Sequence, residues 1–231
     1  MDPDDAIEIS QASEATRGQE TEEQSQERKL REAAREIMTS ERSYVEALRL
    51  LCVDFKSFME NKINGTKKNI IPPADFQKIF KTLPNLLKFN EENLLKDFEE
   101  RIENWDTNPK IADVLKTKGR FLLLYQTYVD EYDVLRNHFK KCCEVNNDFK
   151  EAVKEFETQP QCKNLKLSFY FHKPVQRLLQ YKILLDTYLK YLPKDSTDFD
   201  DTVDALKVVT DVGDQVNEAV RNQVSKHFIR G

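Results

Sequence analysis

Residues 173–185 read Lys173-Pro-Val-Gln-Arg-Leu-Leu-Gln-Tyr-Lys-Ile-Leu-Leu185 and combine a helix-start signal with an amphipathic pattern. Proline is tolerated in the first turn of a helix, because its missing N–H group would have no partner there. We therefore predict a helix that begins near Pro174 and ends near Leu192, before Pro193. Its polar face would contain Lys173, Gln176, Arg177 and Gln180. On pattern alone, this face is more simply a solvated surface than a binding site.

The same helical periodicity extends through most of the chain. Apolar residues recur at spacings of three and four between Thr21 and Met59, and Thr21 with Gln24 has the spacing of a capping box. Further helical patterns cover residues 73–102, 111–142, 148–156 and about 200–226. The chain has only five glycines. We predict an all-α fold, an elongated multi-helix bundle over residues 21–228, preceded by a disordered acidic segment at residues 1–20.

Patterns for catalysis and metal binding are missing from the sequence. Gly65-Thr66-Lys67 lacks the other glycine and the preceding strand of a phosphate-binding loop. The three histidines lie far apart, and the acidic segment 195–204 lacks the central glycine of a calcium-binding loop. We therefore expect no covalent chemistry, so no enzyme in that sense, and neither a cofactor nor a bound metal.

Composition also limits the classes of partner. The longest apolar run, Phe121 to Tyr125, is far shorter than the ~20 residues of a membrane span, and the N-terminal region has no signal-peptide core. The four cysteines lack CxxC spacing, as expected for reduced thiols in a cytoplasmic protein. A net charge of −5 argues against nucleic acid. The segment Lys163 to Tyr191 nevertheless has six basic residues and one acidic residue, which is typical of a binding face.

Two polar residues fall on or beside apolar stripes. Glu41 lies four residues after Ile37 and three before Tyr44, where a carboxylate is costly unless it is paired or exposed. Spacing alone favours a surface glutamate with a salt bridge. Asn217 follows Val216 in the stripe of the last helix, and an isolated asparagine there is unremarkable.

Taken together, these segments resemble the Dbl-homology family. The stretch Glu36-Ile-Met-Thr-Ser-Glu-Arg-Ser-Tyr-Val-Glu-Ala-Leu48 is similar to that family's first conserved region. Residues 173–185 resemble its third region, with the pattern Lys-Pro-x-Gln-Arg-x-x-x-Tyr-x-x-Leu-Leu. Weaker matches are residues 79–102, 125–132, 205–206 and 216–218. The resemblance covers about residues 31–222 and is closest to the faciogenital-dysplasia-type branch.

The resemblance implies a guanine-nucleotide exchange factor for a Rho-family small GTPase, Rac-like or Cdc-type. It implies that Glu41 engages switch I of the GTPase and that Asn217 holds switch II. The full set of expected GTPase-binding residues is Glu41, His172, Lys173, Gln176, Gln180, Asn217 and Arg221. Gln180 replaces the family's usual Lys or Arg, so the resemblance implies that a charged contact to switch II is lost or replaced by a neutral hydrogen bond. His172 replaces the usual Leu or Ile at a position that helps to distinguish Rac-like from Cdc-type GTPases. We expect Glu41→Ala to abolish exchange without loss of stability, since an interface carboxylate contributes little to its own fold.

Two other function classes stay open at this point: a membrane-bending helical scaffold and an interaction bundle without exchange activity. The scaffold would need a long, dense basic surface, which an acidic chain with one short basic stripe does not match. The resemblance implies a cytoplasmic protein, and recruitment to a membrane or to the actin cortex is left open. Since the chain stops at Gly231, soon after the last helical pattern, we expect no lipid-binding pleckstrin-homology module within it.

Overall fold

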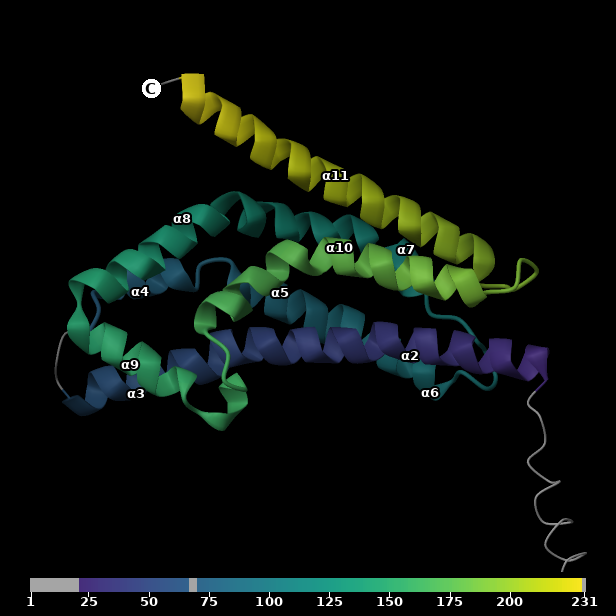
Figure 1. Cartoon of the computed structure of the whole chain (residues 1–231), viewed down its shortest axis with the longest axis horizontal. Helices are drawn as coiled ribbons and strands as arrows, with labels where there is room; N and C mark the ends of the chain where they lie inside the picture. The colour runs from purple at the N-terminus through teal and green to yellow at the C-terminus, as the bar shows by residue number, and fades with distance from the viewer. Residues whose placement is uncertain (1–20, 67–69, 230–231) are drawn as a thin grey trace, which may run out of the picture.

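The computed structural model describes residues 21–66 and 70–229, with side chains up to Glu218 apart from Thr66. None of these residues lies in a β-strand, so the predicted all-α, elongated bundle is confirmed (Figure 1). The predicted disorder of residues 1–20 concerns a segment outside the described residues. The elements are α2 (Glu22–Arg49), π-helix η1 (Leu50–Phe55), α3 (Lys56–Thr66), α4 (Pro73–Ile79), α5 (Leu83–Phe89), π-helix η2 (Asn90–Leu95), α6 (Lys96–Glu103), α7 (Asp113–Lys118), 3₁₀-helix η3 (Gly119–Leu123), α8 (Leu124–Val145), α9 (Asn147–Glu157), 3₁₀-helix η4 (Pro160–Cys162), α10 (Leu167–Tyr191) and α11 (Phe199–Ile229).

The first helix begins as its sequence predicts. The Thr21 hydroxyl accepts from Gln24 N at 3.2 Å, and the Gln24 side chain accepts from Thr21 N at 3.0 Å, which completes the capping box. From there α2, η1 and α3 follow without a break, and their apolar face is buried, including Ile37, Leu51 and Phe55. The periodicity therefore located the buried face correctly.

The pattern over residues 73–102 predicts one helical stretch, but the structure divides it. A turn after Ile79 separates α4 from α5, and Pro84 lies in the first turn of α5. Proline in a helix interior would remove a hydrogen bond and clash with the preceding turn, so a new helix starts there. The pattern over residues 111–142 is likewise divided, at the 3₁₀-helix that begins with Gly119.

The prediction that α10 begins near Pro174 is wrong. The helix begins at Leu167, and Pro174 lies in its interior. Glu157 of α9 caps the new start, because its Oε1 accepts from Leu167 N at 2.9 Å. Beside the proline, the Tyr128 hydroxyl donates to the carbonyl oxygen of Phe171 at 2.7 Å. The carbonyl that loses its helical donor at Pro174 is that of Tyr170, four residues earlier, so the bond to Phe171 instead ties α8 to the adjacent turn of α10.

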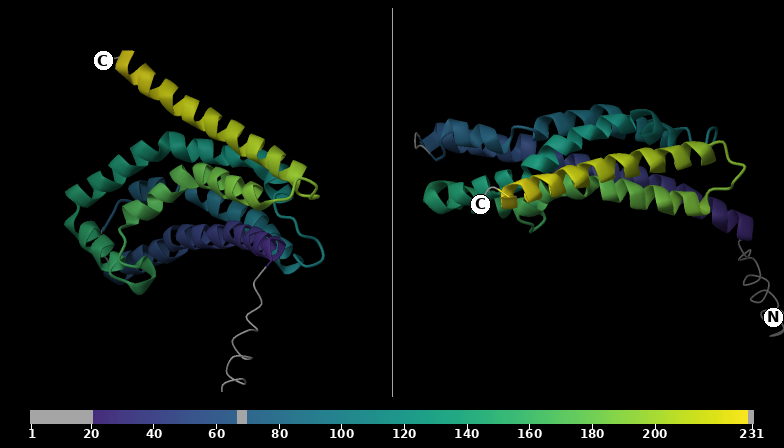
Figure 2. Two further views of the ribbon diagram at one scale, coloured as in Figure 1. Left: turned by 45° about the vertical axis from the view of Figure 1, so that its right-hand side comes forward. Right: turned by 90° about the horizontal axis from the view of Figure 1, so that it is seen from above.

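Three long helices form the frame of the bundle. α2 and α10 are antiparallel neighbours, since Gln26 bonds to Tyr191 O at 3.3 Å and Arg177 bonds to Ser40 Oγ at 2.8 Å. α11 packs against α7, α8 and α10. Its N-terminal part lies on the bundle, whereas its C-terminal part extends away from α10 (Figures 1 and 2). The C-terminal part of α11 therefore does not lie along α10.

Asp198 ties the end of the bundle where α11 begins. Its Oδ2 accepts from Ile111 N at 2.8 Å, from Ala112 N at 3.1 Å and from the Tyr188 hydroxyl at 2.9 Å. Three bonds to one buried oxygen connect the start of α7, the end of α10 and the loop before α11. Burial raises the pKa of Asp198, while the bonds from Ile111 and Ala112 act to lower it.

Gly119 permits the close approach of η3 and α11. A Cβ atom added at Gly119 would clash with Val208 Cγ1, so the Val208 side chain or one of the two elements would have to shift. We expect Gly119→Ala to lower the free energy of unfolding by about 1–3 kcal/mol, as overpacking does. Thermal unfolding followed by circular dichroism measures this change. Gly213→Ala on α11 is the matched control, because its Cβ would meet nothing within 4 Å and should leave the melting temperature unchanged or raise it. Equal melting temperatures for both variants would contradict the close packing.

Candidate functional site

A groove of about 650 Å³ opens between α2 and the segment that leads into α10. On one wall the π-helical turn at Leu50 interrupts the regular helix, and such turns often mark functional sites. On the other wall Lys163 has a left-handed backbone, with φ of 49°, which is costly for a residue other than glycine or asparagine. Asn164, the next residue, has a φ of 59°. The groove is lined by Ser43, Glu46, Ala47, Arg49, Leu50, Val53, Asp54, Gln161, Lys163, Leu165, Phe169, Tyr170 and Lys173.

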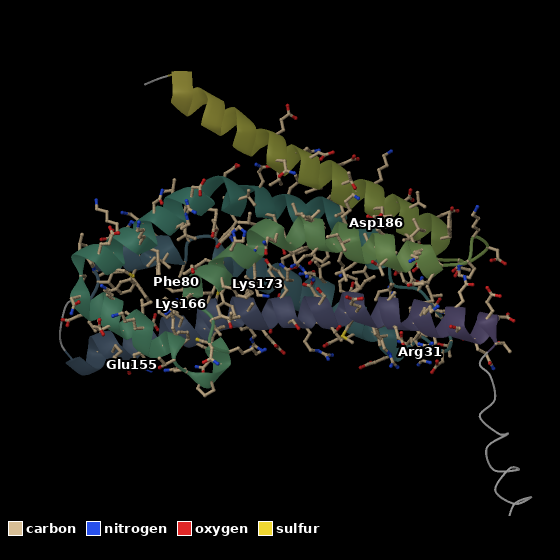
Figure 3. The ribbon with its side chains drawn as sticks, in the orientation of Figure 1. Arg31, Phe80, Glu155, Lys166, Lys173 and Asp186 are labelled. Atoms are coloured by element: carbon tan, nitrogen blue, oxygen red, sulfur yellow. The ribbon has the colours of Figure 1, made fainter. Side chains whose placement is uncertain are left out.

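The groove combines apolar walls with positive charge. Phe169 is 45% exposed, and the Lys173 ammonium lies 5.1 Å from the centre of its ring. Burial lowers the pKa of Lys173, and Arg177 and Lys163 lower it further. Figure 3 shows Lys166 and Lys173 at the α9 end of α10, with Asp186 near the opposite end. Of the basic residues predicted to form a stripe, Lys163 and Lys173 line the groove.

A stripe of α2 continues this surface beyond the groove. At 100° per residue, Glu36, Ser40, Ser43, Ala47 and Leu50 share one side of the helix. The last three line the groove, and Ser40 bonds to Arg177 of α10. Glu36 is exposed, and no described residue forms an ion pair with its carboxylate. We call the Glu36–Leu50 stripe, together with the α10 residues from Phe169 to Ile183 that adjoin it, the α2–α10 face.

Glu41 does not lie on this face. Its exposed fraction is 0%, and its Oε2 accepts from Arg177 Nη2 and from the Tyr181 hydroxyl, each at 2.6 Å. Arg177 is itself only 1% exposed and lies between two aromatic rings, 4.8 Å from the centre of Tyr44 and 4.3 Å from that of Tyr181. The expectation that Glu41 is a surface residue, as a salt-bridged glutamate or as an interface carboxylate, is therefore corrected to a buried ion pair.

The electrostatics of the pair follow from its burial. Burial acts to lower the pKa of Arg177, but interactions with Tyr181 and Glu41 outweigh it and raise the pKa overall. Burial also raises the pKa of Tyr181, and the Glu41 carboxylate adds to that shift. The arginine is thus held in its charged form, and the tyrosine as a neutral donor. Glu41 Oε1 and Arg177 Nε have no hydrogen-bond partner among the described residues.

Arg177 connects this buried pair to the α2–α10 face. Its Nη1 donates to Ser40 Oγ at 2.8 Å and to Gln180 Oε1 at 3.1 Å. Ser40 and Gln180 are both half-buried, so the guanidinium spans from the core to the edge of the surface. Among the predicted site residues, Gln180 is therefore one whose side chain is held by a hydrogen bond from Arg177.

The other predicted residues are distributed over two helices. Gln176 is exposed on α10, whereas His172 is half-buried, with its ring 5.3 Å from that of Tyr132. Asn217 is exposed on α11, and the side chain of Arg221 lies outside the described residues. The structure thus brings Lys173, Gln176 and Gln180 together on α10, whereas Asn217 stands apart on α11.

Sequence reasoning missed Glu36 and Ser40 as candidate site residues. The signal was available in part, because both lie in the stretch Glu36–Leu48 and Glu36 precedes Ser40 by one helical turn. Among the described residues, no cluster of His, Cys, Asp and Glu is placed to hold a metal ion. Within the same part of the chain, no helix is both long enough and apolar enough to cross a membrane.

The α2–α10 face, with a buried ion pair that fixes its edge, is consistent with a domain that acts by binding. The model of the RhoGEF domain family matches residues 33–217, which is most of the chain. The chain belongs to this family.

Individual relatives agree with this assignment. The chain is 39% identical over 193 residues to the mouse FYVE, RhoGEF and PH domain-containing protein 6, and 33% identical over 195 residues to human FYVE, RhoGEF and PH domain-containing protein 4. Each match covers 84% of the chain but only 14% and 25% of those relatives. The expected closeness to the faciogenital-dysplasia-type branch is confirmed by this family of relatives.

Solved structures support the fold. The crystal structure of the DH domain of FARP2 matches with a TM-score of 0.72 at 24% identity, covering 87% of this chain and 93% of that one. The DH/PH domains of PDZ-RhoGEF, solved in complex with GTP-gamma-S activated RhoA, match with a TM-score of 0.74 at 20% identity, covering 94% of this chain and 60% of that one.

Proposed function

We propose that this chain is a guanine-nucleotide exchange factor that binds the switch regions of a Rho-family small GTPase and promotes GDP release and GTP loading. Membership of the RhoGEF family supports the activity, and the RhoA complex of a structural neighbour supports the class of partner. The observation that carries the proposal is the α2–α10 face, where the motif residues Lys173, Gln176 and Gln180 lie beside a groove. We place this activity in the cytoplasm, with the GTPase Rac-like or Cdc-type.

Binding alone is sufficient for this activity. A domain that binds the nucleotide-free GTPase more tightly than the loaded form must weaken nucleotide binding by the same factor, since the coupling between two ligands is reciprocal. A weakening of about a thousandfold corresponds to roughly 4 kcal/mol of coupling. GDP then leaves and GTP refills the site. None of these steps requires a nucleophile or a proton carrier in this chain.

The burial of Glu41 changes the proposed contacts. A carboxylate that is 0% exposed and already accepts two short hydrogen bonds is not available to a partner. Glu36 takes its place in the proposal, because it is exposed on the same stripe as Ser40 and pairs with none of the described residues. Glu41 contributes indirectly, because its buried carboxylate fixes the position of the Arg177 guanidinium. On α11, Asn217 and Arg221 are the proposed contacts to switch II.

The activity is tested by release of a fluorescent GDP analogue from a panel of Rho, Rac and Cdc-type GTPases. We expect the domain to accelerate release from at least one member well above the spontaneous rate, because Glu36 and Gln176 are exposed on the α2–α10 face. The folded state is verified by circular dichroism on the same sample. A folded domain that accelerates release from no member of the panel would instead indicate an interaction bundle without exchange activity.

A further inference from the structure

Gln180 has an amide whose orientation is determined by its neighbour. The Arg177 guanidinium has only N–H donors, so the Gln180 atom that lies 3.1 Å from Nη1 must be the carbonyl oxygen. The amide nitrogen, with two donors, is therefore on the other side. It bonds to no residue in the described part of the chain. A half-buried glutamine is thus left with its donors unused at the edge of the α2–α10 face.

Arg177 cannot easily turn away from this position. Its Nη2 is paired with Glu41 at 2.6 Å, and the rings of Tyr44 and Tyr181 lie on its two sides. A planar guanidinium that is fixed at one nitrogen directs its other nitrogen along a fixed line. The direction of the Gln180 amide is therefore set by the buried ion pair between Arg177 of α10 and Glu41 of α2.

We propose that Arg177 is a positioning residue that turns the Gln180 amide outward, so that its two N–H groups bind an oxygen acceptor on the GTPase. The inference rests on the proposed function and specifies the partner's chemistry at this position: a carboxylate or a carbonyl oxygen. The inference also explains how the neutral side chain of Gln180 can act at a position where the family usually has Lys or Arg. Lys173 already places a positive charge on this part of α10, and a fixed amide supplies donors without a further charge.

Substitutions at Gln180 distinguish an outward donor from a side chain that merely supports Arg177. Gln180→Glu keeps, and strengthens, the acceptor for Arg177, but it replaces the outward donors with an oxygen. We expect its melting temperature to be unchanged or higher and its acceleration of GDP release to fall about tenfold or more. Gln180→Met removes both groups and should fall between Glu and Gln in activity. Gln180→Lys retains a donor and should be at least as active as the wild type.

The control for added charge is Gln77→Glu, an exposed position on α4 outside the α2–α10 face. It should leave exchange unchanged. If Gln180→Glu is as active as the wild type, Gln180 only holds Arg177 and the inference is wrong, although the proposed function stands. If the wild-type domain neither accelerates release nor binds the nucleotide-free GTPase, the inference and the proposed function are both wrong. The rate and the affinity for nucleotide-free GTPase are therefore measured for every variant.

The positioning role of Arg177 has a separate test. Lysine at this position could pair with Glu41 but has a single nitrogen, so it could not also reach Gln180. We expect Arg177→Lys to lower exchange severalfold in the wild-type background. In the Gln180→Lys background the loss should largely vanish, because an ammonium donates in every direction and needs no orientation. An equal fold loss in both backgrounds, measured well below the melting temperature, would overturn the positioning role.

Discussion

Replacing Glu41 with alanine is expected to destabilise the fold by about 3–5 kcal/mol, the usual cost of leaving a buried charge without its partner. Arg177 would remain buried at 1% exposure with its main counter-charge removed. The Tyr181 hydroxyl would also lose its acceptor at 2.6 Å and keep only Asn90 Oδ1 at 3.1 Å. For a domain of this size, the melting temperature should fall by roughly 2–4 °C per kcal/mol, on the order of 10 °C in total. Thermal unfolding followed by circular dichroism measures the shift.

A double substitution separates the pair from the packing around it. Glu41→Leu combined with Arg177→Met removes both charges and keeps most of the volume, so much of the lost stability should return. The exposed Glu36→Ala is the single-site control, and it should leave the melting temperature nearly unchanged. If Glu41→Ala melts at the wild-type temperature, Glu41 is a surface residue after all, as its spacing in the sequence first indicated.

Glu36→Ala should instead abolish most of the exchange activity in a domain that is otherwise intact. Glu36 is exposed on the stripe of α2 that contains Ser40 and leads to the groove. A charge-assisted hydrogen bond to the partner is worth roughly 1.5–3 kcal/mol, so its loss corresponds to about a tenfold to hundredfold lower rate. The rate of release of a fluorescent GDP analogue measures the effect.

The matched control for this experiment is Glu27→Ala, which removes an exposed glutamate from the first turns of the same helix, outside the α2–α10 face. It should exchange at the wild-type rate. Glu36→Gln distinguishes charge from shape, and it should lie between the wild type and alanine. Wild-type activity in Glu36→Ala would exclude this carboxylate from the interface and leave Glu46, at the groove, as the carboxylate to examine.

The contrast between Glu41 and Glu36 shows what periodicity can and cannot determine. Spacing located Glu41 at the edge of an apolar stripe, but its partner Arg177 is 136 residues away and on another helix. Nothing local indicates that pairing. The family resemblance therefore assigned the switch I contact to a residue that the fold buries. Glu36, at the start of the same segment 36–48, was not predicted.

The sequence predicted which segments form helices more accurately than it predicted where each helix begins and ends. The capping box at Thr21 depends on residues three apart, and it formed as expected. The start of α10 did not follow from Pro174, because the cap of Leu167 comes from Glu157 on the preceding helix. Local rules succeed where the partner is within one turn. They fail where tertiary contacts supply it.

The hydrogen bonds of Asp198 lie close to an intrinsic fluorescence probe, the tryptophan side chain. The chain has a single tryptophan, Trp105, which is buried with its ring 6.4 Å from that of Tyr188, a residue that Asp198 holds. Tryptophan emission therefore monitors the junction of α7, α10 and α11, far along the bundle from the groove. The far-ultraviolet signal, by contrast, averages over every helix. Coincident transitions from the two signals would show that both ends of this long bundle unfold as one cooperative unit.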